Sequence, residues 1–592
     1  MPGRHPTPNS ATATKPLQLL ARAADLERNG PDERTPLRPP SKHRLLGGSG
    51  GGIPLRGDDK ADEEPPALLS DPVGWVKSLS RSYSWQLLAM VVCTNHLLKG
   101  FVAGGGDEGL VGKPIEFIFG DMGVTAGRLQ MLKAAAIAPW ALKPVIAMIS
   151  DSWPIFGYKK LPYVVITTVM SFFATLALGF GWATTPRAVV ACLFVIFLQV
   201  SSVDLLVEAK QSEEVKQKAK AGPQFFTFTW LGINFGQVAS VCLLGPMIHH
   251  YGPRAPYLVS APIIALVLWP TLSNFLKETP IPVEERGLNL RLVRKHPILC
   301  SLTIMIGGLI MLLIVSTFML PEGQLVGLAL AFAALVLAGF LVFIRIEICG
   351  PVVFYFLLGM LSFNVEGALF YFYTDSAVQF PQGPHFSAYF YTTALGVATF
   401  GGVMVGFLSG SEIFKGWSYR GILKATILMR VGTQLLLVPA LLRWTTRAGI
   451  PDGAWILMCM ALDSMVFAWR WIPKQVMGAH LTPQGVEATM LGLTAGTFNM
   501  AMILSSYFGG YLLHHFGVVP TGQSYEGATF DNLWKVQVIA AMAPCAMLFL
   551  LPALIPAKLQ TEPLLVERPD SATYNSAFEV VTSGGLRQRR AH

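Results

Sequence analysis

Residues 161–183 read LPYVVITTVMSFFATLALGFGWA and contain no charged side chain. A helix rises about 1.5 Å per residue, so this stretch is long enough to cross the roughly 30 Å hydrocarbon core of a bilayer. The whole 592-residue chain shares this character: it is 52% hydrophobic and 14% charged, whereas ordinary soluble proteins are about 25% charged. A water-soluble protein could not bury so many apolar runs. The sequence therefore predicts a polytopic all-α membrane protein.

The apolar segments can be counted along the chain, and there are fourteen of them. Their ranges are 85–102, 125–149, 161–183, 187–209, 224–249, 255–276, 297–319, 325–346, 351–374, 387–410, 421–442, 454–473, 486–514 and 532–556. The stretch 103–120 is expected to continue the first helix or to form an interfacial turn.

The segments fall into groups of six, two and six. The first six form a half over 85–276, and a loop over 277–296 separates it from a pair of segments within 297–348. That pair carries almost no polar residues, as expected for lipid-facing helices outside a transport route. The second half covers 349–558. Two six-helix halves around a midplane site are the major facilitator architecture, so we expect that fold with twelve spans plus a two-helix insert.

The two tails differ from the spans. Residues 1–84 are rich in Pro, Gly and charge, and we expect them and residues 559–592 to be disordered. No apolar segment follows Met1, so no cleavable signal peptide is expected.

Basic residues gather in the loops on one side of the predicted spans. By the positive-inside rule that side is cytoplasmic, and both tails then face the cytoplasm. The plasma membrane is the expected location, with an organellar membrane as the alternative. The basic residues are Lys159, Lys160, Lys210, Lys216, Lys218, Lys220, Lys277, Arg286, Arg291, Arg294, Lys295, Lys415, Arg420, Arg470 and Lys474.

The remaining composition excludes other classes. The net charge of +9 is dispersed, without the basic block that nucleic-acid binding requires. None of the seven cysteines forms a C-x-x-C pair, so neither a disulfide framework nor a metal site is indicated. We expect no cofactor and no obligate protein partner.

Four stretches combine charge with turn residues, in a fixed order along the chain. They are APWALKPVIAMISDSWPIFGYKKLPY at 138–163, VDLLVE at 203–208, EGALFYFYTD at 366–375 with PQGPHF at 381–386, and LTPQGVEAT at 481–489 with FDNLW at 530–534. This series resembles the signature of the folate–biopterin transporter family, and is most similar to its protozoan branch. The resemblance implies a carrier of folates or pterins.

Within the first and last stretches, the resemblance points to a cytoplasmic gate. Asp151 can pair with basic side chains or cap a helix, and we favour a latch that closes the gate over direct contact with substrate. Glu487 lies where Pro483 and Gly485 interrupt the chain, and it is expected to start a helix at the same gate.

Two acids in the second stretch are candidates for proton coupling. Asp204 and Glu208 are four residues apart and share a helix face, where like charges raise each other's affinity for protons. The alternative is an ion pair of these acids with Lys143 or Lys210 at the cytoplasmic mouth. The sequence favours neither reading over the other.

Glu366 in the third stretch is the candidate substrate ligand. An acid inside an apolar span is costly and usually functional. Phe370 and Tyr373 follow at i+4 and i+7 on the same predicted face. A carboxylate could accept hydrogen bonds from the amino-pyrimidine edge of a pterin while a ring stacks on it. Packing is the alternative role for the aromatic side chains.

Three cations also fall within predicted spans: Lys99, Lys133 and Arg430. They could complement the carboxylates of the glutamyl tail of folate. They could instead pair with Glu366 or Asp463 and hold the halves together.

Three functions remain open on the sequence. We expect proton-coupled secondary transport of folates or pterins by alternating access, with the substrate, the lipid bilayer and protons as partners. A carrier of the same fold for another metabolite, such as S-adenosylmethionine, is the second reading, and competition between the two ligand types would separate them. An intramembrane enzyme or a receptor is the third, but the scattered histidines form no nucleophile–base or metal motif.

Overall fold

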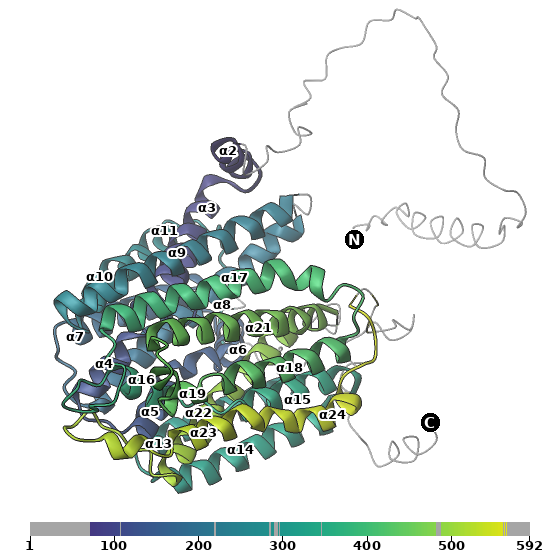
Figure 1. The fold of residues 1–592 in the computed structure, drawn as a ribbon. Helices are drawn as coiled ribbons and strands as arrows, with labels where there is room; N and C mark the ends of the chain where they lie inside the picture. The colour runs from purple at the N-terminus through teal and green to yellow at the C-terminus, as the bar shows by residue number, and fades with distance from the viewer. Residues whose placement is uncertain are drawn as a thin grey trace, which may run out of the picture. The chain divides into compact units, whose positions relative to one another are not determined.

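A computed structural model describes residues 71–564, except 107, 218–220, 283–285, 289–293, 295–296, 345, 481–486, 561 and 563. Within this part, twelve helices are long and apolar enough to cross a membrane. Helices also form at the other two predicted segments, 85–102 and 486–514, so each of the fourteen apolar segments is helical. The secondary structure of the described part is all-α, as predicted (Figure 1).

The N-terminal half follows the predicted order. Its helices are α3 (Trp85–Val91) continued by the π-helical η1 (Val92–Val102), α5 (Ala126–Ile137) continued by η2 (Ala138–Trp140) and α6 (Lys143–Ser152), α7 (Leu161–Gly179), α8 (Pro186–Gln217), α9 (Gly222–Tyr251), and α10 (Ala255–Leu266) with α11 (Leu268–Leu272).

The insert and the C-terminal half come next. The insert is α13 (Pro297–Thr317) and α14 (Glu322–Phe343). The half comprises α15 (Ile346–Leu361) with α16 (Glu366–Thr374), η5 (Phe390–Ala394) with α17 (Leu395–Ile413), α18 (Tyr419–Leu435) with α19 (Val438–Leu441), α21 (Asp452–His480), α22 (Glu487–His515), and α23 (Leu533–Met542), η7 (Ala543–Ala546) and α24 (Met547–Leu554).

Helices of the two halves contact one another at several places. α5 packs against α16 and α22, and α9 packs against η5 and α17. Small residues permit these close approaches: a Cβ added to Gly127 of α5 would lie 2.7 Å from the backbone oxygen of Gly510 in α22.

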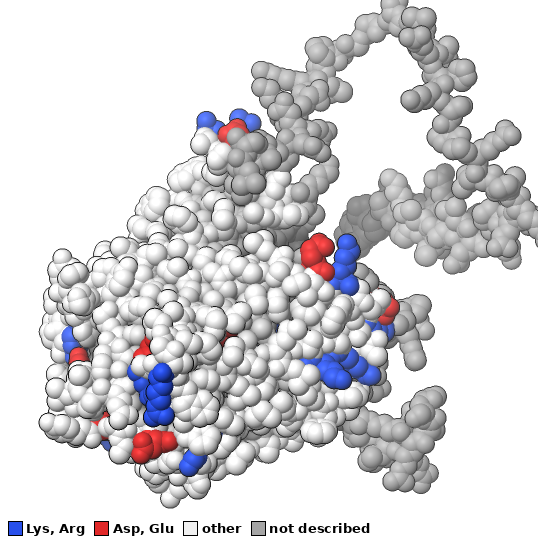
Figure 2. All heavy atoms as spheres, in the orientation of Figure 1, with Lys and Arg blue, Asp and Glu red and all other residues white. Residues whose placement is uncertain are grey.

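The insert lies against both halves. α13 contacts α5 and α6, whereas α14 contacts α15 and α22. Their outer faces leave large apolar side chains exposed, such as Leu312 and Leu330. Figure 2 shows charged side chains on one face mainly near the helix ends, with a wide stretch between that carries almost none. Such a surface suits contact with lipid.

Three boundaries differ from the sequence prediction. The segment expected to be disordered, 1–84, is too long, because residues Pro72–Tyr83 form the helix α2. The Asp71 side chain caps this helix by accepting a 2.8 Å hydrogen bond from the Gly74 N–H. Its apolar residues Trp75, Leu79 and Tyr83 are spaced i, i+4, i+8 and are buried. The rings of Trp75 and Tyr83 pack on α9.

The other two differences lie near the centre. The stretch 103–120 is neither a continued helix nor a simple turn, because it contains α4 (Pro114–Asp121). The segment 351–374 is not one continuous helix, because residues 362–365 separate α15 from α16.

Candidate functional site

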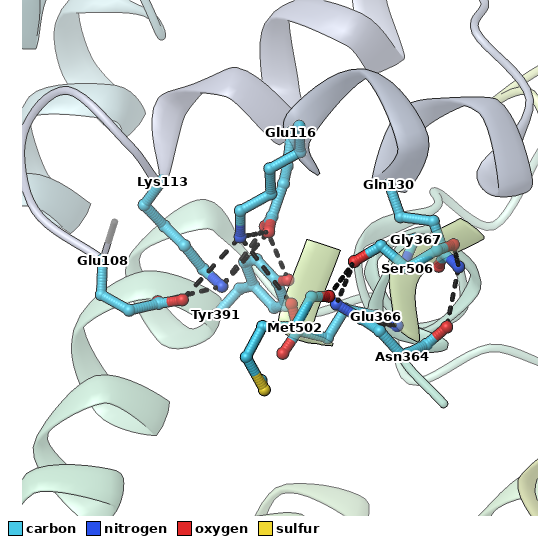
Figure 3. A network of polar contacts seen from close by, with 11 residues as sticks. Glu108, Lys113, Glu116, Gln130, Asn364, Glu366, Gly367, Tyr391, Met502 and Ser506 are labelled. Carbon is cyan, nitrogen blue, oxygen red and sulfur yellow. Dashed lines mark hydrogen bonds and ion pairs between the residues drawn. The ribbon is translucent and has the colours of Figure 1, made fainter. Parts of the chain in front are cut away.

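The break between α15 and α16 exposes backbone groups that a side chain from the other half satisfies. Gln130 of α5 donates to the Asn364 carbonyl oxygen at 2.7 Å and accepts from the Gly367 N–H at 3.3 Å (Figure 3). The Asn364 side-chain oxygen accepts from the Glu366 N–H at 2.8 Å. Broken helices whose ends face a cavity are typical of carrier sites.

A cavity of about 160 Å³ opens beside this break. Glu366 starts α16 and lines it, with 55% of its side chain exposed. All the lining residues belong to the C-terminal half, and they combine cations with aromatic rings. They include Tyr355, Asn364, Arg430, Gln434, Phe467, Arg470, Trp471, Lys474, Phe498 and Ser505.

Behind Glu366 lies a buried ionic network that joins the two halves (Figure 3). The Lys133 ammonium of α5 lies 3.7 Å from the Glu366 carboxylate and 3.0 Å from that of Glu116 in α4. Glu116 is 1% exposed and accepts a 2.8 Å hydrogen bond from the Tyr391 hydroxyl of η5. Lys113 lies 3.4 Å from the same carboxylate.

The charges in this network hold Glu116 ionised. Burial by itself would raise the pKa of Glu116, but the ammonium groups of Lys113 and Lys133 outweigh that effect and lower the pKa to about 2. Glu116 is therefore a fixed anion at neutral pH. Sequence reasoning missed it because 103–120 was expected to continue the first helix or to form an interfacial turn, although an acid flanked by apolar residues in PIEFIF was a usable signal.

The structure separates Phe370 and Tyr373 from the exposed carboxylate of Glu366. Both rings are buried and neither lines the cavity. Phe370 lies edge-on to Phe117 of α4 at 5.1 Å and to Tyr391 at 5.6 Å, measured between ring centroids. Phe370 therefore packs at the contact between the halves, whereas Tyr373 packs against rings of the C-terminal half, Phe386 and Tyr391.

Lys99, Lys143 and Asp204 form a second cluster, entirely within the N-terminal half. The Asp204 carboxylate is buried between the Lys99 ammonium at 2.6 Å and the Lys143 ammonium at 2.5 Å. This is the ion pair with Lys143 that the sequence left open, whereas Lys210 pairs with Glu213 at 2.8 Å. Glu208 follows one turn later as an exposed residue. None of this cluster lines the cavity.

The two remaining gate candidates have simpler surroundings. Asp151 is an exposed residue near the end of α6. The start of α7 is instead satisfied by Glu278, whose carboxylate accepts from the backbone N–H groups of Lys159, Lys160 and Leu161. The side chain of Glu487 lies outside the described residues.

Arg430 pairs with Asp463 at 3.2 Å, as one of the open readings had it. Two further cations were misplaced by the sequence prediction. Arg470 and Lys474 were assigned to a loop at the end of the twelfth segment, but α21 continues to His480 and places both on the cavity wall. The missed signal is helical spacing, because Arg470 and Lys474 follow Asp463 and Phe467 on one face.

In the part of the chain that the structure describes, two helical halves, twelve membrane-length helices and a cavity beside a broken helix define a membrane carrier of the major facilitator type. The fold matches solved carriers: a POT family transporter in complex with 5-aminolevulinic acid superposes with a TM-score of 0.55 at 13% identity, covering 79% of this chain and 96% of that one.

The sequence comparison defines the family. The model of the BT1 family matches residues 108–565, and the chain belongs to that family. Similar proteins include probable folate-biopterin transporter 6 of Arabidopsis thaliana, 22% identical over 80% of this chain and 83% of that protein. The folate-biopterin transporter of Synechocystis is 23% identical over the same shares. The protein is thus an integral membrane transporter and not an enzyme.

Proposed function

We propose that this protein carries folates and related pterins across a membrane by alternating access, coupled to protons. The observation that carries the proposal is Glu366: an acid at a helix break, half exposed to a cavity, with a long ion-pair distance of 3.7 Å to Lys133. Its carboxylate has room to accept hydrogen bonds from the amino-pyrimidine edge of a pterin. The names of the relatives agree with this substrate class.

The contacts between the halves support alternating access. At the end of the bundle that carries α4, the Tyr371 hydroxyl donates to the Val124 carbonyl at 2.5 Å and the Ala126 N–H donates to that of Pro520 at 3.0 Å. Together with the Glu116–Tyr391 hydrogen bond, they would have to break for this end to open. We assign this end to the outside and both tails to the cytoplasm, from the positive-inside distribution of Lys and Arg, and we place the protein in the plasma membrane.

For proton coupling we propose Glu208 together with Asp204. Glu208 is exposed one helical turn from Asp204, whose charge already has two lysine partners. Protonation of Glu208 would neutralise its own carboxylate and leave the paired charge of Asp204 unchanged. Asp151, Lys143 and Glu487 stay assigned to the cytoplasmic gate.

Uptake by the purified protein in liposomes tests the proposal. Labelled folic acid and labelled biopterin should enter faster than into empty liposomes, and faster when the outside is acidic. The E366Q variant should lose most of this uptake, whereas E412Q, which changes an exposed acid of α17, should retain it. Absence of uptake of both compounds at every pH would overturn the proposal.

A further inference from the structure

One face of α21 forms a cationic and aromatic wall of the cavity. Phe467, Arg470, Trp471 and Lys474 all line it, at helical positions i, i+3, i+4 and i+7. Arg430 of α18 contributes a third cation. Among the described lining residues, Glu366 is the one acid.

The three cations differ in how their charge is balanced. Arg430 has a carboxylate partner in Asp463. For Arg470 and Lys474, no acid within the described part of the chain lies at ion-pair distance. The Nη1 atom of Arg470 is buried without a hydrogen-bond partner there. The Lys474 ammonium instead lies over two rings, 3.0 Å from the centroid of Phe498 and 4.0 Å from that of Trp471.

Such an arrangement is costly unless an anion enters the cavity. A cation within a membrane-spanning helix needs a counter-charge even when it is half-buried, as Arg470 and Lys474 are, and contact with aromatic faces offsets only part of its lost hydration. The planar guanidinium of arginine can bind a carboxylate through two parallel hydrogen bonds. Arg470 and Lys474 are four residues apart on one helix, a spacing of about 6 Å, so they can bind two neighbouring carboxylates together.

We propose that Arg470 and Lys474 bind the carboxylates of a substrate whose flat heterocycle lies between Trp471 and Glu366. This inference rests on the proposed function and narrows it to pteridines that carry an acidic tail. A neutral pterin would leave both cations without a partner. A sulfonium metabolite such as S-adenosylmethionine would add a further positive charge beside them.

Three ligands that differ in carboxylate number provide the test: folic acid with two, pteroic acid with one and biopterin with none. Affinities are measured on purified full-length protein. Wild type should bind folic acid most tightly and biopterin least. R470Q and K474Q should each lower the affinity for folic acid by about tenfold to a hundredfold and leave the affinity for biopterin unchanged. R470K should recover part of the loss.

The control is K424Q, which removes an exposed cation of α18 away from the cavity, and it should bind like wild type. Equal wild-type affinity for all three ligands, or equal losses for folic acid and biopterin in R470Q and K474Q, would overturn the inference while leaving pterin transport intact. Failure of wild type to bind any of the three would instead overturn the proposed function. If a glutamine variant does not fold, R470K and K474R carry the same comparison.

Discussion

Asp375 directly follows the span that ends at Thr374, and its side chain is only 4% exposed. Its Oδ2 atom has no hydrogen-bond partner within the described residues. Burial, and to a smaller degree the charge of Glu526, raises the pKa of this carboxyl from 3.8 to about 7. The folded protein therefore binds this proton more tightly than the unfolded chain does.

The resulting pH dependence can be measured. Because the folded-state pKa is the higher one, stability should fall as the pH rises from about 4 to about 7, and then level off. At pH 8 the free energy of unfolding of D375N should exceed that of wild type by roughly 1–3 kcal/mol, and its unfolding temperature should be higher. At pH 4 the two proteins should be equally stable. D531N, which changes an exposed acid, is the control. Identical pH profiles for D375N and wild type would contradict this account.

Asp204 allows the two readings of its role to be separated. Removing its carboxylate, which is buried, leaves the half-buried ammonium groups of Lys99 and Lys143 without this counter-charge. D204N should therefore lose about 3–5 kcal/mol of stability, and D204N/K143M should recover part of it because one unpaired cation is gone. Thermal unfolding of the three proteins checks this. A D204N protein as stable as wild type, with uptake that no longer depends on pH, would favour a role in coupling alone.

At the level of elements, α4 joins the halves through the Glu116–Tyr391 hydrogen bond (Figure 3). Y391F removes this bond, which is worth about 1.5–3 kcal/mol because its acceptor is charged. Hydrogen exchange of the α4 amides should then become about tenfold to a hundredfold faster, while α14 keeps its rate. Y389F, which alters an exposed ring two residues away, should change neither. Unaltered exchange in α4 would show that the bond does not hold this end closed.

The positions of the helices could be predicted from the sequence where hydropathy alone determines them. Each of the fourteen apolar segments is helical, because a bilayer leaves an apolar run of that length few other structures. The interruption at 362–365 was not foreseen, because the polar groups that stabilise it come from Gln130, 234 residues away. The full length of α21 was missed for a related reason: Arg470 and Lys474 look like loop charges until a cavity is known to accept them.

The candidate site was foreseen only in part. Glu366 could be selected because an acid in an apolar span is rare, and the structure places it on the cavity. Phe370 and Tyr373 share its predicted face, yet they are buried where α16 meets α4 and η5. Helical periodicity describes one helix, whereas the neighbours that cover each face come from distant parts of the chain.

At the scale of the whole molecule, the insert is attached to both halves: the C-terminal end of α13 bonds to α5 of the N-terminal half and to α22 of the C-terminal half. Arg128 of α5 donates to the Thr317 carbonyl, and the Thr317 and Tyr507 hydroxyls lie 2.5 Å apart. Arg128 does not line the cavity. R128A should lower the unfolding free energy by about 1–3 kcal/mol and leave the affinity for folic acid unchanged. A large loss of affinity in a folded R128A protein would contradict this separation of the insert from the site.

Alternating access requires that one cavity open in turn to the two sides of a membrane, and a counterflow experiment detects this behaviour. Liposomes containing the protein are loaded with unlabelled folic acid and diluted into a trace of labelled folic acid at equal pH. We expect a transient accumulation of label above its equilibrium level, which is abolished in E366Q and retained in E412Q. Label that only equilibrates, at a rate that does not saturate with concentration, would contradict alternating access.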